Sequence, residues 1–205
     1  MQAQGITAED ARKTGTTTLA MVCKDCVVVA AESKVTMGYL VSSKEFPKIY
    51  QIDDKMVMTV SGGVGDAQSV VRILRAEINI YKLTRNAELT VKGVSTLLAN
   101  IQQNSRFYPY MLMPIIAGVD RTGMHVFSVD PAGGIGEDAY TSTGSGSPFA
   151  YGVLEDGFRK DMTREEGIDL ATRAVRAARE RDIASGGKNI DIAVIDKNGT
   201  EFLRK

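Results

Sequence analysis

The chain has 205 residues, and its 25 lysines and arginines balance 25 aspartates and glutamates, so the formal net charge at pH 7 is zero. Because there is no basic surplus to neutralise phosphates, neither a nucleic acid nor an anionic membrane is indicated as a partner. No Pro/Gly/Ser-rich linker divides the chain, no apolar run approaches the roughly 20 residues of a membrane span, and residues 1–15 are charged rather than apolar, so we expect one cytoplasmic domain.

The first half of the chain predicts short strands followed by two helices. Residues 1–15 show neither helical nor strand periodicity. Runs rich in β-branched and apolar residues predict strands at 17–23, 26–31, 49–52 and 56–61. Apolar residues then recur at helical spacing, which predicts one helix over about 66–83 and a second around 94–101. We expect these two helices to pack together.

The second half repeats this order. Strands are predicted at 111–119, 125–129 and 137–142. Two helices should follow, one from near Ser147 and one from Thr163, which forms a capping box with Glu166. A strand at 190–195, a turn at 197–199 and a short last strand end the chain. The order of elements predicts a layered α+β fold rather than a doubly wound parallel sheet.

Two features that often carry chemistry are weak in this chain. Cys23 and Cys26 are the only cysteines, and the single histidine, His125, is far away in sequence, so a zinc site cannot be completed locally. Lys24 and Asp25 between the cysteines resemble a hairpin turn, which favours two reduced, buried thiols. His125 lies in an alternating strand pattern, so a histidine triad is not favoured. We expect neither a metal nor a cofactor.

A glycine-rich loop at 61–66, SGGVGD, joins a predicted strand to a predicted helix. Backbone amides at such a junction can bind an anion. The loop has no lysine and no G-x-x-x-x-G-K-[ST] spacing, so a nucleotide site is not favoured. Its glycines suit a tight turn and an oxyanion hole about equally well. Two further turns, at 141–147 and 181–187, are by themselves only element boundaries.

The tripeptide Thr16-Thr17-Thr18 follows Gly15 at the start of the first predicted strand. Taken alone, three β-branched residues favour a simple strand start. A threonine hydroxyl becomes a useful nucleophile when a base lies beside it, and a cut after Gly15 would provide Thr16 with a free α-amine as that base. Since His125 is not a usable base, any hydrolytic chemistry in this chain should use another one.

Six segments in this order resemble proteasome β subunits of the archaeal type. They are KTGTTT at 13–18, Glu32, FPKIYQI at 46–52, GGVGDAQ at 62–68, STGSGSP at 142–148 and RDIASGG at 181–187. The resemblance covers essentially the whole chain from Lys13 onward. It implies an N-terminal-nucleophile hydrolase with a four-layer αββα sandwich, which agrees with the order of elements above.

The resemblance also implies roles for matched positions. Residues 1–15 would be a propeptide, removed by self-cleavage of the Gly15–Thr16 bond, and 16–205 would be the single catalytic domain. The implied catalytic set is Thr16 as nucleophile, Glu32 and Lys48 as a charged pair, the Gly62 N–H as oxyanion donor, and Ser145, Asp182 and Ser185 as a polar cluster. Many members have Asp in place of Glu32, and we expect the longer acid to reach Lys48 as well.

These implied roles are chemically coherent. A free α-amine titrates near pH 8, so an appreciable fraction is neutral and can accept the hydroxyl proton. Lys48, kept positive by Glu32, would lower the pKa of that amine. By the same resemblance, Val35, Thr36, Phe46, Val60 and Val64 would line the pocket that binds the substrate residue before the cut. These residues offer no carboxylate for a basic side chain. We therefore expect cleavage after apolar residues.

The implied function is that of a catalytic β subunit of the 20S proteasome, a threonine endopeptidase made as a zymogen. Its partners would be α subunits, other β subunits in seven-membered rings of a four-ring barrel, a regulatory ATPase cap acting through the α ring, and unfolded polypeptide substrate. A non-catalytic ring subunit is the alternative, but such members typically lose the nucleophile or its lysine. The related bacterial two-ring threonine protease normally has little or no propeptide and lacks the GSGSP turn found here at 144–148.

Overall fold

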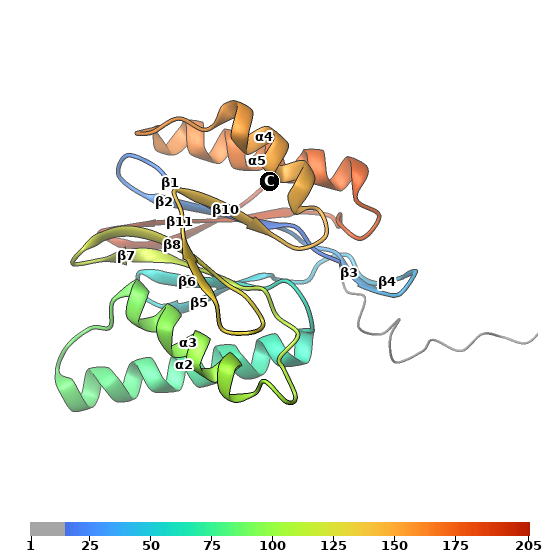
Figure 1. The fold of residues 1–205 in the computed structure, drawn as a ribbon. Helices are drawn as coiled ribbons and strands as arrows, with labels where there is room; N and C mark the ends of the chain where they lie inside the picture. Colours follow the sequence, from blue (N-terminus) through green and yellow to red (C-terminus); the bar gives the residue numbers. More distant parts are fainter. Residues whose placement is uncertain (1–14) are drawn as a thin grey trace, which may run out of the picture.

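Two antiparallel five-stranded sheets face each other in the computed structural model, which describes residues 15–205 (Figure 1). The first sheet has the order β10-β1-β2-β11-β12. Its strands are β1 (Thr18–Val22), β2 (Val27–Glu32), β10 (Tyr140–Thr143), β11 (Ile190–Asp196) and β12 (Gly199–Arg204). The second sheet has the order β5-β6-β7-β8-β9. Its strands are β5 (Ile49–Asp53), β6 (Met56–Thr59), β7 (Ile115–Asp120), β8 (Gly123–Val129) and β9 (Ile135–Glu137).

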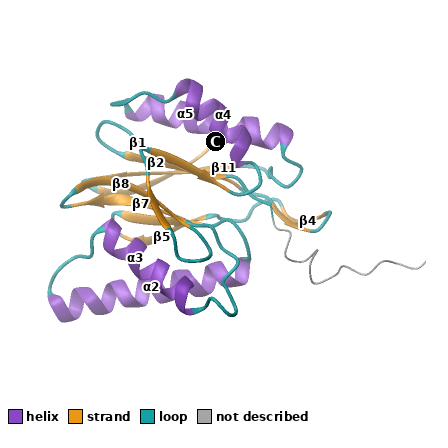
Figure 2. Cartoon of the chain, in the orientation of Figure 1, coloured by secondary structure: helices purple, strands orange, loops and turns teal. Residues whose placement is uncertain are grey.

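Two pairs of helices cover the outer faces of the sheets, as Figure 2 shows. Helices α4 (Ser147–Gly157) and α5 (Arg164–Arg181) lie on the first sheet, and α2 (Val64–Arg85) and α3 (Val91–Asn104) lie on the second. A capping box begins α5, since the Thr163 side chain accepts from the Glu166 N–H and the Glu166 side chain accepts from the Thr163 N–H. The predicted α+β fold with four layers, αββα, is confirmed.

Strands β1 and β2 are buried on both faces because each face meets a different layer. Leu19 and Met21 belong to the apolar cluster under α4 and α5, whereas Ala20 belongs to the cluster between the two sheets. Val28 and Val29 on β2 divide in the same way. Side chains alternate across a strand, so an almost continuous apolar run supplies both clusters. Full burial of such a side chain stabilises the fold by roughly 1.5–3 kcal/mol. The residues at the ends of these strands are therefore attached to a stable sheet.

Two predicted strands differ from the structure, and one hairpin was not predicted. The strand predicted at 111–119 begins only at Ile115, because Pro114 has no N–H to donate and Met113 N donates to Ser61 O (3.0 Å) instead. The strand predicted at 137–142 is two strands, β9 and β10, which lie in different sheets. The hairpin of β3 (Val35–Met37) and β4 (Leu40–Ser43) was not predicted, since its apolar residues are largely exposed and show no alternation.

The two cysteines lie at the turn between β1 and β2. Cys23 N donates to Cys26 O (2.8 Å), and both thiols are free and buried. A hydrogen bond from Cys26, together with burial, raises the pKa of the Cys23 thiol.

Within residues 15–205, no helix has the length and apolar composition needed to cross a membrane.

Candidate active site

Thr16 lies two residues before β1 and is buried. β1 pairs with β2 along one edge and with β10 along the other, so the start of this strand is held from both sides. The turn after β10 also contacts Thr16, because Gly146 N donates to Thr16 O (3.2 Å). Gly144 in this turn has a φ of 97°, and a Cβ there would overlap the Thr16 carbonyl. The position of Thr16 is therefore set by the sheet and by this glycine turn.

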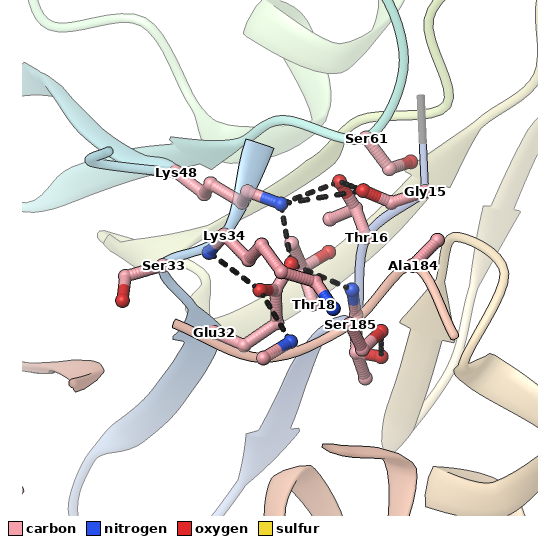
Figure 3. Close-up of polar contacts among 12 residues, drawn as sticks. Gly15, Thr16, Thr18, Glu32, Ser33, Lys34, Lys48, Ser61, Ala184 and Ser185 are labelled. Atoms are coloured by element: carbon pink, nitrogen blue, oxygen red, sulfur yellow. Dashed lines mark hydrogen bonds and ion pairs between the residues drawn. The ribbon is translucent and has the colours of Figure 1, made fainter. Parts of the chain in front are cut away.

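Lys48 and Glu32 face the Thr16 side chain from neighbouring elements (Figure 3). Glu32 is the last residue of β2, and Lys48 comes directly before β5. Lys48 Nζ donates to Glu32 Oε1 and to Thr16 Oγ1, the latter at 2.7 Å. Both charged side chains are almost completely buried. A buried ion pair thus places its cation on the threonine hydroxyl.

The second oxygen of Glu32 is also bonded. Oε2 accepts from Lys34 N (2.7 Å) and from Gly186 N (2.9 Å), so the carboxylate is fixed in orientation. Burial lowers the pKa of Lys48 below its ordinary value, and the attraction of Glu32 opposes that shift. Removal of one partner of such a buried pair would leave an uncompensated charge. The pair lies next to Thr16, the residue that would become N-terminal after a cut at Gly15.

Ser145, Asp182 and Ser185 form one hydrogen-bonded network. The hydroxyls of Ser145 and Ser185 both donate to Asp182 Oδ2, at 2.6 Å and 2.5 Å. Thr16 N in turn donates to Ser145 Oγ (3.1 Å), and Thr17 Oγ1 lies 2.6 Å from Ser185 Oγ. The carboxylate therefore holds two hydroxyls, one of which contacts the backbone nitrogen of Thr16.

The Gly15–Thr16 peptide bond is intact and lies within this group of side chains. Thr16 Oγ1 donates to Gly15 O (2.6 Å), and Lys48 Nζ lies 3.5 Å from the same carbonyl oxygen. Gly15 N donates to Thr36 Oγ1 (3.4 Å). A Cβ on Gly15 would overlap the Cβ of Ala184. The hydroxyl and the cation thus both face the carbonyl of the bond before Thr16, and the close fit leaves room only for glycine.

Gly62 lies three residues after the end of β6 and has a φ of 121°, which favours glycine. Its neighbours are bonded on both sides, since Met113 N donates to Ser61 O (3.0 Å) and Gly63 N donates to Met111 O (2.9 Å). The N–H of Gly62 itself has no acceptor among residues 15–205. A held amide with a free N–H is what an oxyanion donor requires.

A small hollow, open to solvent, lies beside Thr16. It is lined by Gly15, Thr16, Val35, Phe46, Lys48, Val60, Gly62 and Val64. Four of the five residues predicted for the substrate pocket line it. The fifth, Thr36, is buried and contacts the Gly15 N–H instead. Apart from Thr16 and Lys48, whose charge is paired, the side chains of the lining are apolar.

Two residues at the site were not predicted to have a role. Thr17 contacts Ser185, and Lys34 Nζ donates to Ile183 O (2.9 Å), 149 positions along the chain. No periodicity or motif in the sequence signals a contact over that separation. His125 on β8 forms hydrogen bonds with Thr122, in the turn before it, and with Glu137 on β9. It forms no hydrogen bond with any of the predicted site residues.

Comparison with known proteins finds similar chains over most of the length of this one. The family model described as "Proteasome subunit" matches residues 12–195. "Proteasome subunit beta" of Methanosarcina barkeri is 50% identical over 190 residues, which cover 92% of this chain and 90% of that protein. "Proteasome subunit beta" of Methanococcoides burtonii is 51% identical over 190 residues, 92% and 90% of the two chains. The protein of that name from Thermoplasma acidophilum is 48% identical over 185 residues, 90% and 87% of the two chains.

Proposed function

This chain belongs to the proteasome subunit family as a catalytic beta subunit of the 20S core, and from that premise we propose that it is a threonine endopeptidase whose nucleophile is Thr16 Oγ1. The observation that supports this most directly is the contact of Lys48 Nζ with Thr16 Oγ1 at 2.7 Å, within a buried pair with Glu32. An alternative role as a non-catalytic ring subunit is not favoured, because the nucleophile and its lysine are both present.

The first reaction is cleavage of the chain's own Gly15–Thr16 bond. The hydroxyl oxygen of Thr16 attacks the Gly15 carbonyl carbon, and the C–N bond breaks as the nitrogen of Thr16 takes up a proton. The product is an ester between Gly15 and the Thr16 side chain, which water hydrolyses. This step releases residues 1–15 as a propeptide. Residues 1–14 of that segment lie outside the part of the chain that the structure describes.

The second reaction uses the α-amine that the first one creates. The neutral amine accepts the proton of Thr16 Oγ1 as the oxygen attacks a substrate carbonyl. The Gly62 N–H donates to the oxyanion, and the cationic Lys48 stabilises negative charge on the attacking oxygen. Collapse of this intermediate expels the amine of the leaving peptide, which takes the proton. Water then hydrolyses the acyl ester on Thr16 and regenerates the amine and hydroxyl.

The substrate preference follows from the lining of the hollow beside Thr16. Val35, Phe46, Val60 and Val64 supply apolar surface, and the lining offers no carboxylate for a basic side chain. Unfolded polypeptides with an apolar residue before the cut are the proposed substrates. The proposed assembly has seven-membered rings of this chain beside α-subunit rings, with an ATPase cap that delivers substrate through the α ring. We place this assembly in the cytoplasm.

The test is to mix the full chain with its α partner and follow intact mass, N-terminal sequence and hydrolysis of fluorogenic peptides. We expect a chain that starts at Thr16 and that cleaves the apolar peptide fastest. Thr16→Ala should assemble, stay uncut and hydrolyse nothing. A stable chain that still starts at Met1, or turnover by Thr16→Ala, would refute the assignment of the nucleophile. A faster rate on the basic peptide would refute only the proposed preference.

A further inference from the structure

Residues 182–189 connect the end of α5 to the strand β11, and the first six of them, 182–187, carry both Asp182 and Ser185. None of these six residues lies in a helix or strand, so their position depends on individual bonds to neighbouring segments. The Ile183 side chain at the apex of this loop is 83% exposed, which means that side-chain packing does not anchor it. The Asp182 carboxylate nevertheless has to stay in place to hold Ser145 against Thr16 N.

Lys34, two residues after the end of β2, reaches this loop with its side chain. Its Nζ donates to Ile183 O (2.9 Å). Its stem lies along Gly186, since a Cβ there would be 3.2 Å from Nζ, 3.3 Å from Cε and 3.4 Å from Cδ of Lys34. Its backbone N donates to Glu32 Oε2, the same oxygen that accepts from Gly186 N. One residue thus contacts the loop through its side chain and the catalytic carboxylate through its backbone.

We propose that Lys34 is a positioning residue for Thr16, which clamps residues 182–187 so that Asp182 and Ser145 hold the Thr16 nitrogen beside its own hydroxyl. The proposal rests on the proposed function above. Lys34 contacts neither Thr16 nor the hollow beside it, so it acts through Ile183, Asp182 and Ser145 rather than on the substrate.

Other bonds of the loop lie on both sides of Ile183. Asp182 N donates to Ala178 O (2.8 Å) at the end of α5, and Ala184 N donates to Asp182 Oδ1 (3.3 Å). Arg179 donates to Gly187 O (2.6 Å), and Ser33 N donates to Gly186 O (3.1 Å). These contacts fix residues 186–187 whether or not Lys34 is present. Ile183 lies directly beside Asp182. Among residues 15–205, the bond from Lys34 Nζ is the hydrogen bond that ties Ile183 to a distant segment of the chain. Its loss should therefore let residues 183–184 move, and with them the Asp182 carboxylate that Ala184 N contacts, while the two backbone ends of the loop stay in place.

The expected consequence is a change of rate more than a change of stability. A single exposed hydrogen bond contributes little to folding, so the variant should fold and assemble. Small displacements of groups that orient a reacting atom, in contrast, can cost large factors in rate. The amine of mature Thr16 would then spend less time directed at its hydroxyl, which lowers kcat. The apolar hollow is untouched, so KM should change little.

The experiment compares Lys34→Met with Lys34→Arg in the full chain assembled with α subunits. We expect Lys34→Met to lower kcat on an apolar fluorogenic peptide by about tenfold per mature Thr16, with KM within about twofold. The count of mature sites comes from intact mass. Arginine is also a cationic donor on a long stem, so Lys34→Arg should return kcat to within about threefold of the parent.

Lys188→Met is the matched control, because Lys188 follows the same loop but pairs with Glu45 on the surface (2.7 Å) and does not contact Ile183. Its kcat should equal that of the parent. Lys34→Gln is measured in parallel, and slow turnover is expected, so that poor assembly of the methionine variant still leaves a test.

The proposal is overturned if the assembled Lys34→Met and Lys34→Gln variants keep the parental kcat, or if Lys34→Arg is as slow as Lys34→Met. Failure of the proposed function itself would look different, since the parent chain would then be inactive or Thr16→Ala active.

Discussion

At Lys48, burial and an ion pair act in opposite directions on one ammonium group. Burial lowers its pKa below the ordinary value, Glu32 raises it, nearby Lys34 lowers it and Asp182 raises it. The ammonium is needed in the charged form to stabilise the attacking oxygen of Thr16. Activity should therefore be lost on the alkaline side as the pH rises through the pKa of Lys48, at a lower pH than an ordinary lysine would require.

Glu32→Gln tests this balance. The substitution removes the largest influence that opposes burial, so the pKa of Lys48 should fall further and the alkaline loss of activity should move to lower pH. The measurement is kcat/KM of the assembled enzyme as a function of pH. An alkaline limb that stays in place, or moves to higher pH, would show that Glu32 does not keep Lys48 charged.

Gly15→Ala tests the fit around the bond to be cut. The added methyl group would overlap Ala184 and lie 2.8 Å from Ser145 Oγ, so the Gly15 carbonyl must move away from Thr16 Oγ1. We expect self-cleavage to slow by about a hundredfold, measured as the fraction of chains starting at Thr16 over time. Gly152→Ala, where an added Cβ meets nothing within 4 Å, is the control and should mature normally. Equal rates for the two variants would contradict the prediction.

On the scale of elements, helix α5 packs so closely on strands β1 and β2 that there is no room for one added methyl group between them. Gly167 lies in the first turns of α5, and a Cβ there would collide with Cys23 Sγ and lie 3.2 Å from Val28 Cγ2. Cys23 is therefore a packing residue under α5. The two thiols of the hairpin serve the fold and not the reaction proposed above.

Gly167→Ala should destabilise the chain by about 1–3 kcal/mol through overpacking, although alanine is the better helix former by about 1 kcal/mol. The change is measured as the shift in denaturation midpoint. Gly167→Ala combined with Cys23→Ala removes the sulfur that the new methyl group meets, so it should be more stable than Gly167→Ala alone. A double variant that is less stable than both single variants would refute the assigned contact.

The sequence predicts elements well where burial is periodic and poorly where it is not. The helical stripes of α2 and α5 and the apolar runs of β1 and β2 were evident, because each has a fixed face against a layer. The break between β9 and β10 was missed because residues 137–142 look like one strand, although the chain passes between sheets there. Thr16, Glu32 and Lys48 were inferred from motifs, whereas Lys34 was missed because its partner lies 149 positions away.

On the scale of the whole molecule, the sandwich leaves large aromatic side chains in solvent. Tyr39 at the β3–β4 hairpin is 97% exposed, and Phe107 and Tyr108 after α3 are 80% and 91% exposed. Exposed aromatic residues are enriched at protein interfaces. Because the chain is a member of a multisubunit proteasome family, these residues are expected to be covered by neighbouring subunits.

Phe107→Ser combined with Tyr108→Ser should reduce the fraction of chains that assemble with α subunits. The fold of the single chain should be unchanged, because both side chains are largely exposed in it. Native mass spectrometry measures assembly, and far-UV circular dichroism checks the fold. Normal assembly of the double variant would show that this surface is not an interface.

The ends of most protein chains fray, and the first residues of a domain are usually its least ordered. The end that a cut before Thr16 creates would be different, because it begins two residues from a strand paired along both edges. The amine would be immobilised from the moment of cleavage. The loss of conformational entropy needed to order it therefore occurs when the sheet folds and not at each turnover. A chain terminus can serve as a catalytic base only if it stays still, and the position of β1 inside the sheet provides that stillness.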